Sequence, residues 1–166
     1  MPRFISVALI AAAATLSACS GLELEPEPSG PLVPMTRLRA EPYSFTYYSG
    51  MKTFERLVVR DAAAWQTVWT QIHAGRTPVT PPPTVDFSRE MIVVAAMGEY
   101  STGGYSILLE RATEDRTGGI AISVHSTSPG SNCVVTLAFT APVDIARLPL
   151  LAGPVRFYER SETTTC

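Results

Sequence analysis

The sequence has little positive charge, and no part of it gathers that charge together. Its 166 residues include 13 lysines and arginines against 15 aspartates and glutamates, a formal net charge of −2 at pH 7. Proteins that bind nucleic acids neutralise phosphates with clustered basic side chains. No basic run or stripe occurs here. The charge pattern therefore argues against a nucleic-acid partner.

Residues that bind metals or cofactors are also scarce. The chain has two histidines, His73 and His125, and three cysteines. Structural and catalytic metal sites usually show close spacings such as C-x-x-C or H-x-x-x-H, and neither occurs in this sequence. We expect each histidine to be an ordinary side chain, and we predict no metal site and no cofactor.

The patterns of common hydrolases and phosphate-binding loops are absent as well. There is no G-x-S-x-G nucleophile elbow and no G-x-x-x-x-G-K-[ST] loop. Neighbouring carboxylates occur at Asp86 with Glu90 and at Glu114 with Asp115, where charged turns explain them more simply than acid–base chemistry. We therefore predict no catalytic residues and a protein that is not an enzyme.

The N-terminal hydrophobic run is too short to span a membrane. "FISVALIAAAATL" follows Arg3, and the small residues Ser17 and Ala18 precede Cys19. A charged start, a short apolar run and a small-residue cleavage site are typical of a secretory signal. We predict a signal peptide over residues 1–18.

The cysteine directly after this site resembles the end of a bacterial lipoprotein signal. The resemblance implies that Cys19 becomes the acylated first residue of the mature protein, with palmitate among its chains. Buried acyl chains contribute about 0.8 kcal/mol per methylene to membrane binding. Ser20 resembles the outer-membrane sorting pattern of Gram-negative bacteria, so we expect a lipid-anchored protein of the cell envelope, at the outer membrane. The alternative is an ordinary exported protein with a chance cysteine near its cleavage site.

Residues 19–42 are rich in proline and glutamate and show no amphipathic period. We predict a mostly extended tether there and one folded domain over residues 43–166.

Cys133 and Cys166 form an even pair in an exported chain, which favours a disulfide. It would close a loop of about 34 residues and contribute roughly 3–4 kcal/mol to stability. Metal binding by these cysteines with His73 or His125 is the alternative.

One segment has a clear helical period. Asp61 is a good N-cap, three alanines follow, and Trp65, Val68, Trp69 and Ile72 share one face before Gly75. We predict a helix packed on a sheet by its tryptophans.

The rest of the domain favours strands. Runs with a period of two, or continuously apolar runs, predict strands at residues 43–48, 52–60, 91–97, 105–111, 119–125, 133–140 and 154–160. We expect a helical turn at residues 144–148. The fold class is therefore α+β: a mainly antiparallel sheet of about six to seven strands with one tryptophan-bearing helix on a face.

The stretch "GEYSTGGYS", residues 98–106, is the most distinctive loop. It lacks a helix behind it and a following lysine, so it does not fit a phosphate site. We interpret it as a shaped hairpin loop whose glycines allow a positive φ or the close approach of another backbone. It is our candidate partner-contact loop, through Gly98, Tyr100, Thr102, Gly103, Gly104 and Tyr105.

Several segments together resemble the C-terminal domain of PrcB-like proteins. These are "AAAWQTVWTQI", "PTVDFSREMIVVAAMGEYSTGGYSI" and "PGSNCVVT" leading to "VRFYERSETTTC", and they cover roughly residues 55–160. The specific features are Asp86-Phe87 with Glu90, the T-G-G-Y-S element, and Pro129-Gly130. Members of this family are named as protease complex subunits. The resemblance implies an exported or lipid-anchored bacterial protein without an assigned catalytic site.

Two functions remain open from the sequence. The first is a non-enzymatic, lipid-anchored binding or assembly module that contacts a partner protein, such as a surface protease. The alternative is a small envelope enzyme or ligand-binding lipoprotein that uses the Gly98–Ser106 loop as a pocket wall.

Overall fold

The computed structural model describes residues 28–38, 48–77 and 81–166. The predicted signal peptide, the predicted lipidation site Cys19 and the strand predicted at residues 43–48, apart from Tyr48, lie outside the described residues. Within the described part, no helix is long and apolar enough to cross a membrane.

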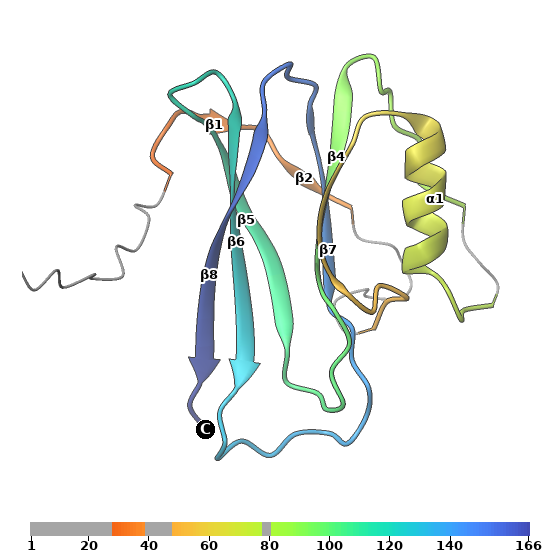
Figure 1. The fold of residues 1–166 in the computed structure, drawn as a ribbon, viewed down its shortest axis with the longest axis vertical. Helices are drawn as coiled ribbons and strands as arrows, with labels where there is room; N and C mark the ends of the chain where they lie inside the picture. Colours follow the sequence, from red (N-terminus) through yellow and green to blue (C-terminus); the bar gives the residue numbers. More distant parts are fainter. Residues whose placement is uncertain (1–27, 39–47, 78–80) are drawn as a thin grey trace, which may run out of the picture.

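Eight strands and one helix make up this part of the chain (Figure 1). In chain order they are β1 (Leu32–Val33), β2 (Thr36–Arg37), β3 (Phe54–Val59), α1 (Ala62–Ile72), β4 (Glu90–Met97), β5 (Ser106–Glu114), β6 (Ile120–Pro129), β7 (Val143–Pro149) and β8 (Val155–Thr164). The α+β class and the single helix are therefore confirmed, and the strands divide between two sheets.

The strand orders are β1-β5-β6-β8 in the first sheet and β2-β7-β4-β3 in the second. All pairs are antiparallel except β6 with β8, which run parallel over ten residue pairs from Ile120↔Val155 to Pro129↔Thr164. The predicted mainly antiparallel pairing is thus confirmed.

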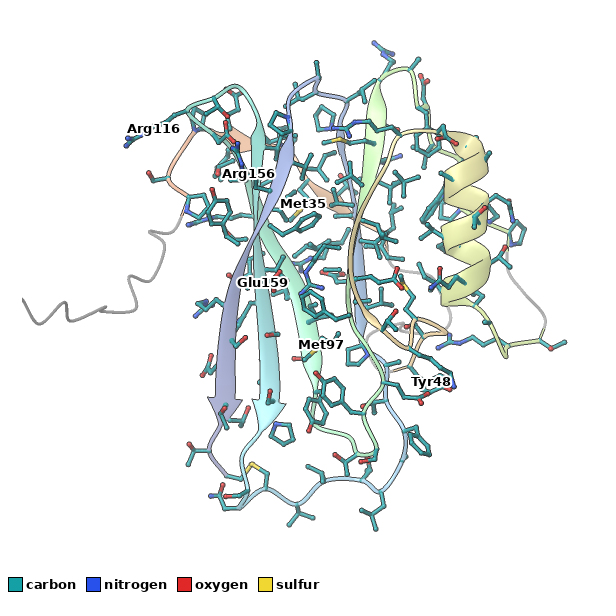
Figure 2. The ribbon with its side chains drawn as sticks, in the orientation of Figure 1. Met35, Tyr48, Met97, Arg116, Arg156 and Glu159 are labelled. Carbon is teal, nitrogen blue, oxygen red and sulfur yellow. A yellow bond between two sulfur atoms is a disulfide. The ribbon has the colours of Figure 1, made fainter. Side chains whose placement is uncertain are left out.

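Two hydrophobic cores hold the layers together. One lies between the two sheets, where Met35 and Met97 are seen in Figure 2. The other lies between the second sheet and α1. Strand β4 serves both cores because its side chains alternate between them, which explains why it is apolar at every position from Met91 to Met97.

Helix α1 forms as its sequence predicts. Asp61 is the N-cap, and its side chain accepts a hydrogen bond from the Ala64 amide at 2.8 Å. Trp65 and Trp69 are buried against the sheet with their rings edge to face, 5.2 Å apart. The indole of Trp65 donates to the Pro83 carbonyl, which docks the proline-rich loop onto the helix.

The strand predicted at residues 133–140 is wrong. Residues 133–139 form a connection between β6 and β7, and Thr140 makes only an isolated bridge to Tyr100. The position beside β6 that this strand would occupy is taken by the C-terminal strand β8. Residues 133–139 therefore belong to neither sheet, although their side chains alternate as in a strand.

The helical turn predicted at residues 144–148 is also wrong, because these residues lie within strand β7. β7 pairs with β4 over seven residue pairs, from Glu90↔Pro149 to Ala96↔Val143. It is buried on both faces: Val143 and Ile145 face the helix core, and Ala146 and Leu148 face the core between the sheets. An interior strand does not need the polar alternation on which the sequence interpretation relied.

The folded region also begins earlier than residue 43. Residues 28–38, which the sequence analysis assigned to the tether, form β1 and β2 on the edges of the two sheets. Val33 and Met35 contribute to the core between the sheets. Such short strands carry too few residues to show a period.

Candidate functional site

The loop from Gly98 to Ser106 is shaped by its glycines. Gly98 and Gly104 have φ values of +86° and +93°, which favour glycine over any other residue. A side chain on Gly98 would also lie 3.2 Å from the backbone of Lys52 and Phe54. The predicted use of glycine for positive φ is correct at both positions.

This loop packs on the connection between β6 and β7, residues 130–142. Tyr100 and Thr140 exchange backbone hydrogen bonds of 2.7 and 2.9 Å, and the Gly103 amide donates to the Thr136 carbonyl at 2.9 Å. The Thr140 hydroxyl donates to the Thr102 carbonyl at 2.7 Å. A Cβ on Gly103 would lie 2.3 Å from the Thr136 hydroxyl oxygen. A glycine at position 103 therefore allows the connection between β6 and β7 to approach the loop this closely.

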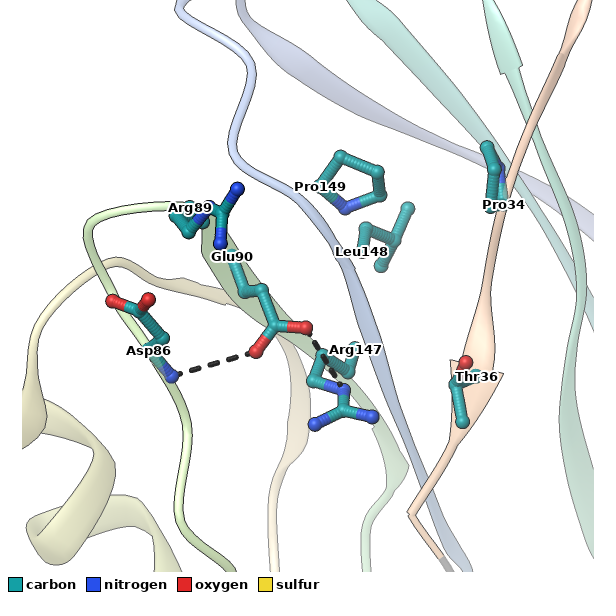
Figure 3. Close-up of a pocket in the computed structure, with 8 residues that line it drawn as sticks. All are labelled: Pro34, Thr36, Asp86, Arg89, Glu90, Arg147, Leu148 and Pro149. Carbon is teal, nitrogen blue, oxygen red and sulfur yellow. Dashed lines mark hydrogen bonds and ion pairs between the residues drawn. The ribbon is translucent and has the colours of Figure 1, made fainter.

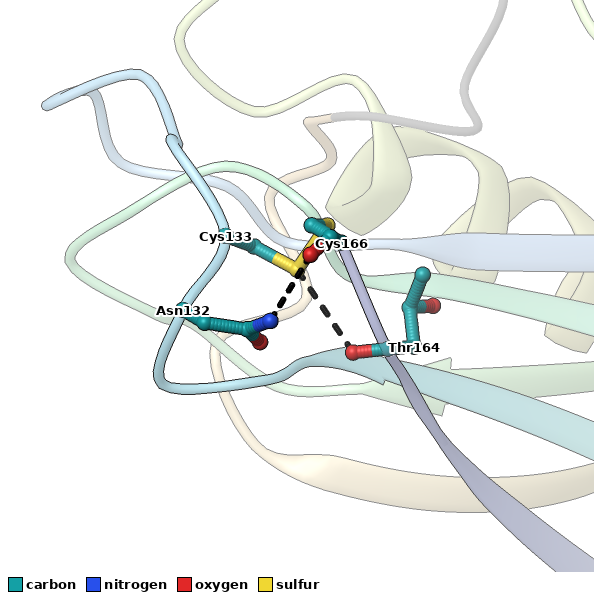
Figure 4. The surroundings of a disulfide bond; sticks show 4 residues. All are labelled: Asn132, Cys133, Thr164 and Cys166. Carbon is teal, nitrogen blue, oxygen red and sulfur yellow. Dashed lines mark hydrogen bonds between the residues drawn. A yellow bond between two sulfur atoms is a disulfide. The ribbon is translucent and has the colours of Figure 1, made fainter.

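The same connection is tied to the C-terminus (Figure 4). Cys133 and Cys166 form a disulfide, as predicted. The Gly130 amide donates to the Thr164 carbonyl at 3.0 Å, and the Asn132 side-chain amide donates to the Cys166 carbonyl at 2.8 Å. The connection is thus held at its start by the disulfide and further along by the glycine loop.

Between these restraints the connection exposes large apolar side chains. Val134, Leu137 and Phe139 are 102%, 92% and 65% exposed. We call these three residues the apolar tip. They lie on the segment that crosses the lower end of the ribbon in Figure 1. No charged residue occurs between Ser126 and Val143, so the apolar tip lies within an uncharged segment.

A known protein family matches the part of the chain that contains the glycine loop and the connection. Residues 91–149 match the family described as PrcB C-terminal. This region is a PrcB C-terminal domain. The match runs from β4 to β7 and includes both the glycine loop and the apolar tip. No curated protein and no solved structure matches the chain.

The predicted contact residues of the PrcB C-terminal domain differ in exposure. Gly98 and Gly103 are buried, Tyr100, Thr102 and Tyr105 are partly buried, and Gly104 is exposed. The rings of Tyr100 and Tyr105 stack on each other at 3.8 Å and pack against the core. Much of the loop therefore supports the connection, and the apolar tip is the exposed part. The sequence analysis placed Leu137 and Phe139 in a strand predicted over residues 133–140, so it missed this exposed surface.

The Asp86-Phe87 and Glu90 motif precedes the PrcB C-terminal domain and stabilises a turn. Asp86 accepts hydrogen bonds from the hydroxyl and, more weakly, the amide of Ser88, which lower the pKa of its carboxyl. Glu90 accepts from the Asp86 amide at 3.4 Å and pairs with Arg147 at 3.3 Å (Figure 3). Phe87 packs on the helix core.

This turn borders a hollow of about 420 Å³ that is lined by Pro34, Thr36, Asp86, Arg89, Glu90, Arg147, Leu148 and Pro149. A second hollow of about 450 Å³ lies by the β5–β6 turn. There Asp115 pairs with Arg156 at 2.5 Å, and hydrogen bonds from Thr117 and Gly119 lower the pKa of Asp115. The glycine loop lines neither hollow.

The two histidines lie apart from the glycine loop's contacts. His73 is buried at the end of α1, where its Nδ1 lies 2.8 Å from the Trp69 carbonyl, and burial lowers its pKa. His125 lies between Glu110 and Glu162 on the outer face of the first sheet. Among the described residues, no group of three or more His, Cys, Asp or Glu residues is placed to hold a metal ion.

Proposed function

We propose that this protein is a non-enzymatic, lipid-anchored binding and assembly module of the bacterial cell envelope. In this role it is an accessory subunit of a surface protease complex. The acylated Cys19 anchors it to the outer membrane, and the apolar tip contacts the partner protein.

The exposure of the apolar tip carries this proposal. Burying a Val, Leu or Phe side chain is worth about 1.5–3 kcal/mol, so leaving three of them in water forgoes several kcal/mol. Exposed apolar clusters on monomers commonly mark interaction sites. The disulfide and the hydrogen bonds to Gly103 and Tyr100 explain why these side chains stay outside rather than folding back onto the core.

The restraints also favour tight recognition. A loop that is already held in one conformation loses less conformational entropy when a partner binds. The family name supports a protease as the partner, since PrcB-like proteins are named as protease complex subunits. The uncharged segment around the tip fits an apolar groove on such a partner better than an ionic surface.

The test places a photo-crosslinking amino acid at Leu137 in cells that make the full chain. We expect a covalent adduct to a protein with a peptidase domain, identified by mass spectrometry. The matched control places the same amino acid at Leu32, which is 75% exposed but lies on β1, away from the tip. Adducts to lipid alone, or the same adducts from both positions, would contradict the proposal.

A substitution series tests the same surface without a crosslinker. Leu137→Ser and Phe139→Ser should each weaken partner recovery from detergent-solubilised membranes at least tenfold, whereas Leu32→Ser should leave it unchanged. Because the tip residues are exposed, these variants should fold as well as the original chain. Equal recovery of the partner with all three variants would show that the apolar tip is not part of the binding surface.

Lipid attachment is tested separately. Radioactive palmitate should label the protein, and Cys19→Ser should abolish the label. Labelling that survives this substitution would refute the lipid anchor while leaving the test of the apolar tip intact.

A further inference from the structure

Strand β8 forms one edge of the first sheet. Only half of its backbone N–H and C=O groups therefore form hydrogen bonds with a neighbouring strand. β8 pairs with β6 in parallel. Hydrogen bonds at the two ends of the strand show which residues face β6. The Pro154 carbonyl accepts from the Ile120 amide, and the Thr164 carbonyl accepts from the Gly130 amide. In a parallel pair alternate residues face the partner strand. The even-numbered residues of β8 therefore face β6, and the N–H and C=O groups of Val155, Phe157, Glu159, Ser161 and Thr163 point outward.

Arg56 on β3 and Arg60 just after it contact β8 at Glu159 and the chain before the strand at Gly153. Arg56 on β3 donates two hydrogen bonds of 2.7 and 2.8 Å to the carboxylate of Glu159, which lies midway along β8 (Figure 2). Arg60 donates to the Gly153 carbonyl just before the strand. No described strand pairs with this outward edge, and its second half, residues 159–164, is exposed.

We propose that a second copy of this chain pairs with this half of β8, antiparallel and related by a two-fold axis at Ser161. An unpaired strand edge is matched by another extended backbone, which supplies the missing donors and acceptors. About this axis Ser161 lies opposite the partner's Ser161, and Glu159 lies opposite the partner's Thr163. These are all outward-facing positions, so each can make the hydrogen bonds of an antiparallel pair.

The charges of β8 are self-complementary in this register. Arg160 lies directly opposite the partner's Glu162, and Glu162 lies opposite the partner's Arg160. Both side chains already point to the same outer face, because Arg160 pairs with Glu110 at 2.9 Å and Glu162 with His125 at 3.2 Å. Opposite charges across an antiparallel pair stabilise it, and like charges destabilise it. This complementarity favours a second copy over an unrelated strand.

The contact is polar and short, so the dimer is weak, with a dissociation constant on the order of 0.1 mM. Sedimentation velocity of the full chain in detergent should show a monomer that converts to a dimer as protein concentration passes through this range. A monomer at every concentration up to about ten times this value would overturn the proposal. The proposal would also be overturned if a different protein were found bound along β8.

Charge reversal tests the register. Arg160→Glu and Glu162→Arg should each weaken self-association at least tenfold, because each places like charges opposite one another twice. Mixing the two variants should restore a dimer of original strength, since every pair is then of opposite charge. The double variant, with both changes in one chain, should also dimerise. If the mixture stays monomeric or the single variants dimerise normally, the register is wrong.

A backbone variant tests the edge itself. Ser161→Pro removes an outward N–H that β6 does not use, so the monomer should keep its fold while the dimer is lost. Leu137→Ser, which alters the apolar tip, should leave dimerisation unchanged. That control separates this inference from the proposed partner site. A dimer that persists in Ser161→Pro with its fold intact would contradict strand pairing.

Discussion

Removing the disulfide should destabilise the protein by an amount that its loop length predicts. The perturbation is the double substitution Cys133→Ser and Cys166→Ser, which leaves the predicted lipidation site intact. The two cysteines are 33 residues apart. The entropy of closing a loop of this length in the unfolded chain corresponds to about 4 kcal/mol at 25 °C. The native state should change little, since hydrogen bonds from Gly130 and Asn132 remain.

Urea unfolding followed by tryptophan fluorescence measures this loss, because Trp65 and Trp69 are buried in the helix core. We expect the unfolding free energy to fall by about 3–4 kcal/mol. The m-value should rise, since an uncrosslinked chain exposes more surface when it unfolds. Reduced original protein should behave like the double variant. A loss below about 1 kcal/mol would refute the reasoning, as it would mean that the restraint on the unfolded chain contributes little.

Three further outcomes follow from the packing. Trp69→Ala should lower the unfolding free energy by about 3–5 kcal/mol in the same urea assay, because Trp69 is almost fully buried; an unchanged midpoint would contradict its core role. Gly103→Val should cost about 1–3 kcal/mol by overpacking against Thr136, and hydrogen exchange should show faster opening of the connection over residues 130–142. Stability should decrease as pH falls from about 6.5, because the unfolded chain protonates His73 before the folded one does. His73→Gln should flatten this part of the stability profile. An equally steep decrease in the variant would show that a group other than His73 causes it.

Local patterns explain most of the elements that the sequence predicted correctly. The N-cap Asp61 and the tryptophan face of α1 depend on residues within one helix, so the helical period reports them directly. Strands β3, β4, β5, β6 and β8 were predicted close to their true positions for the same reason. The cysteine pair needed only the count of cysteines and an exported chain.

The errors arise where long-range pairing decides the structure. Residues 133–139 alternate as a strand should, yet β8 occupies the place beside β6. β7 looked like a connection because an interior strand buried on both faces shows no period of two. No local pattern contains the information that a competing strand is available elsewhere in the chain.

The α+β class, the tryptophan helix, the disulfide and the family resemblance could be predicted from the sequence, because each depends on residue type and short spacing. The role of the glycine loop depends instead on contacts between segments that are far apart in the chain. Gly103 is small because Thr136, 33 positions later, must approach it, and this contact holds an apolar tip in solvent. Exposure depends on what the rest of the chain covers, and the order of apolar residues along the sequence does not specify that.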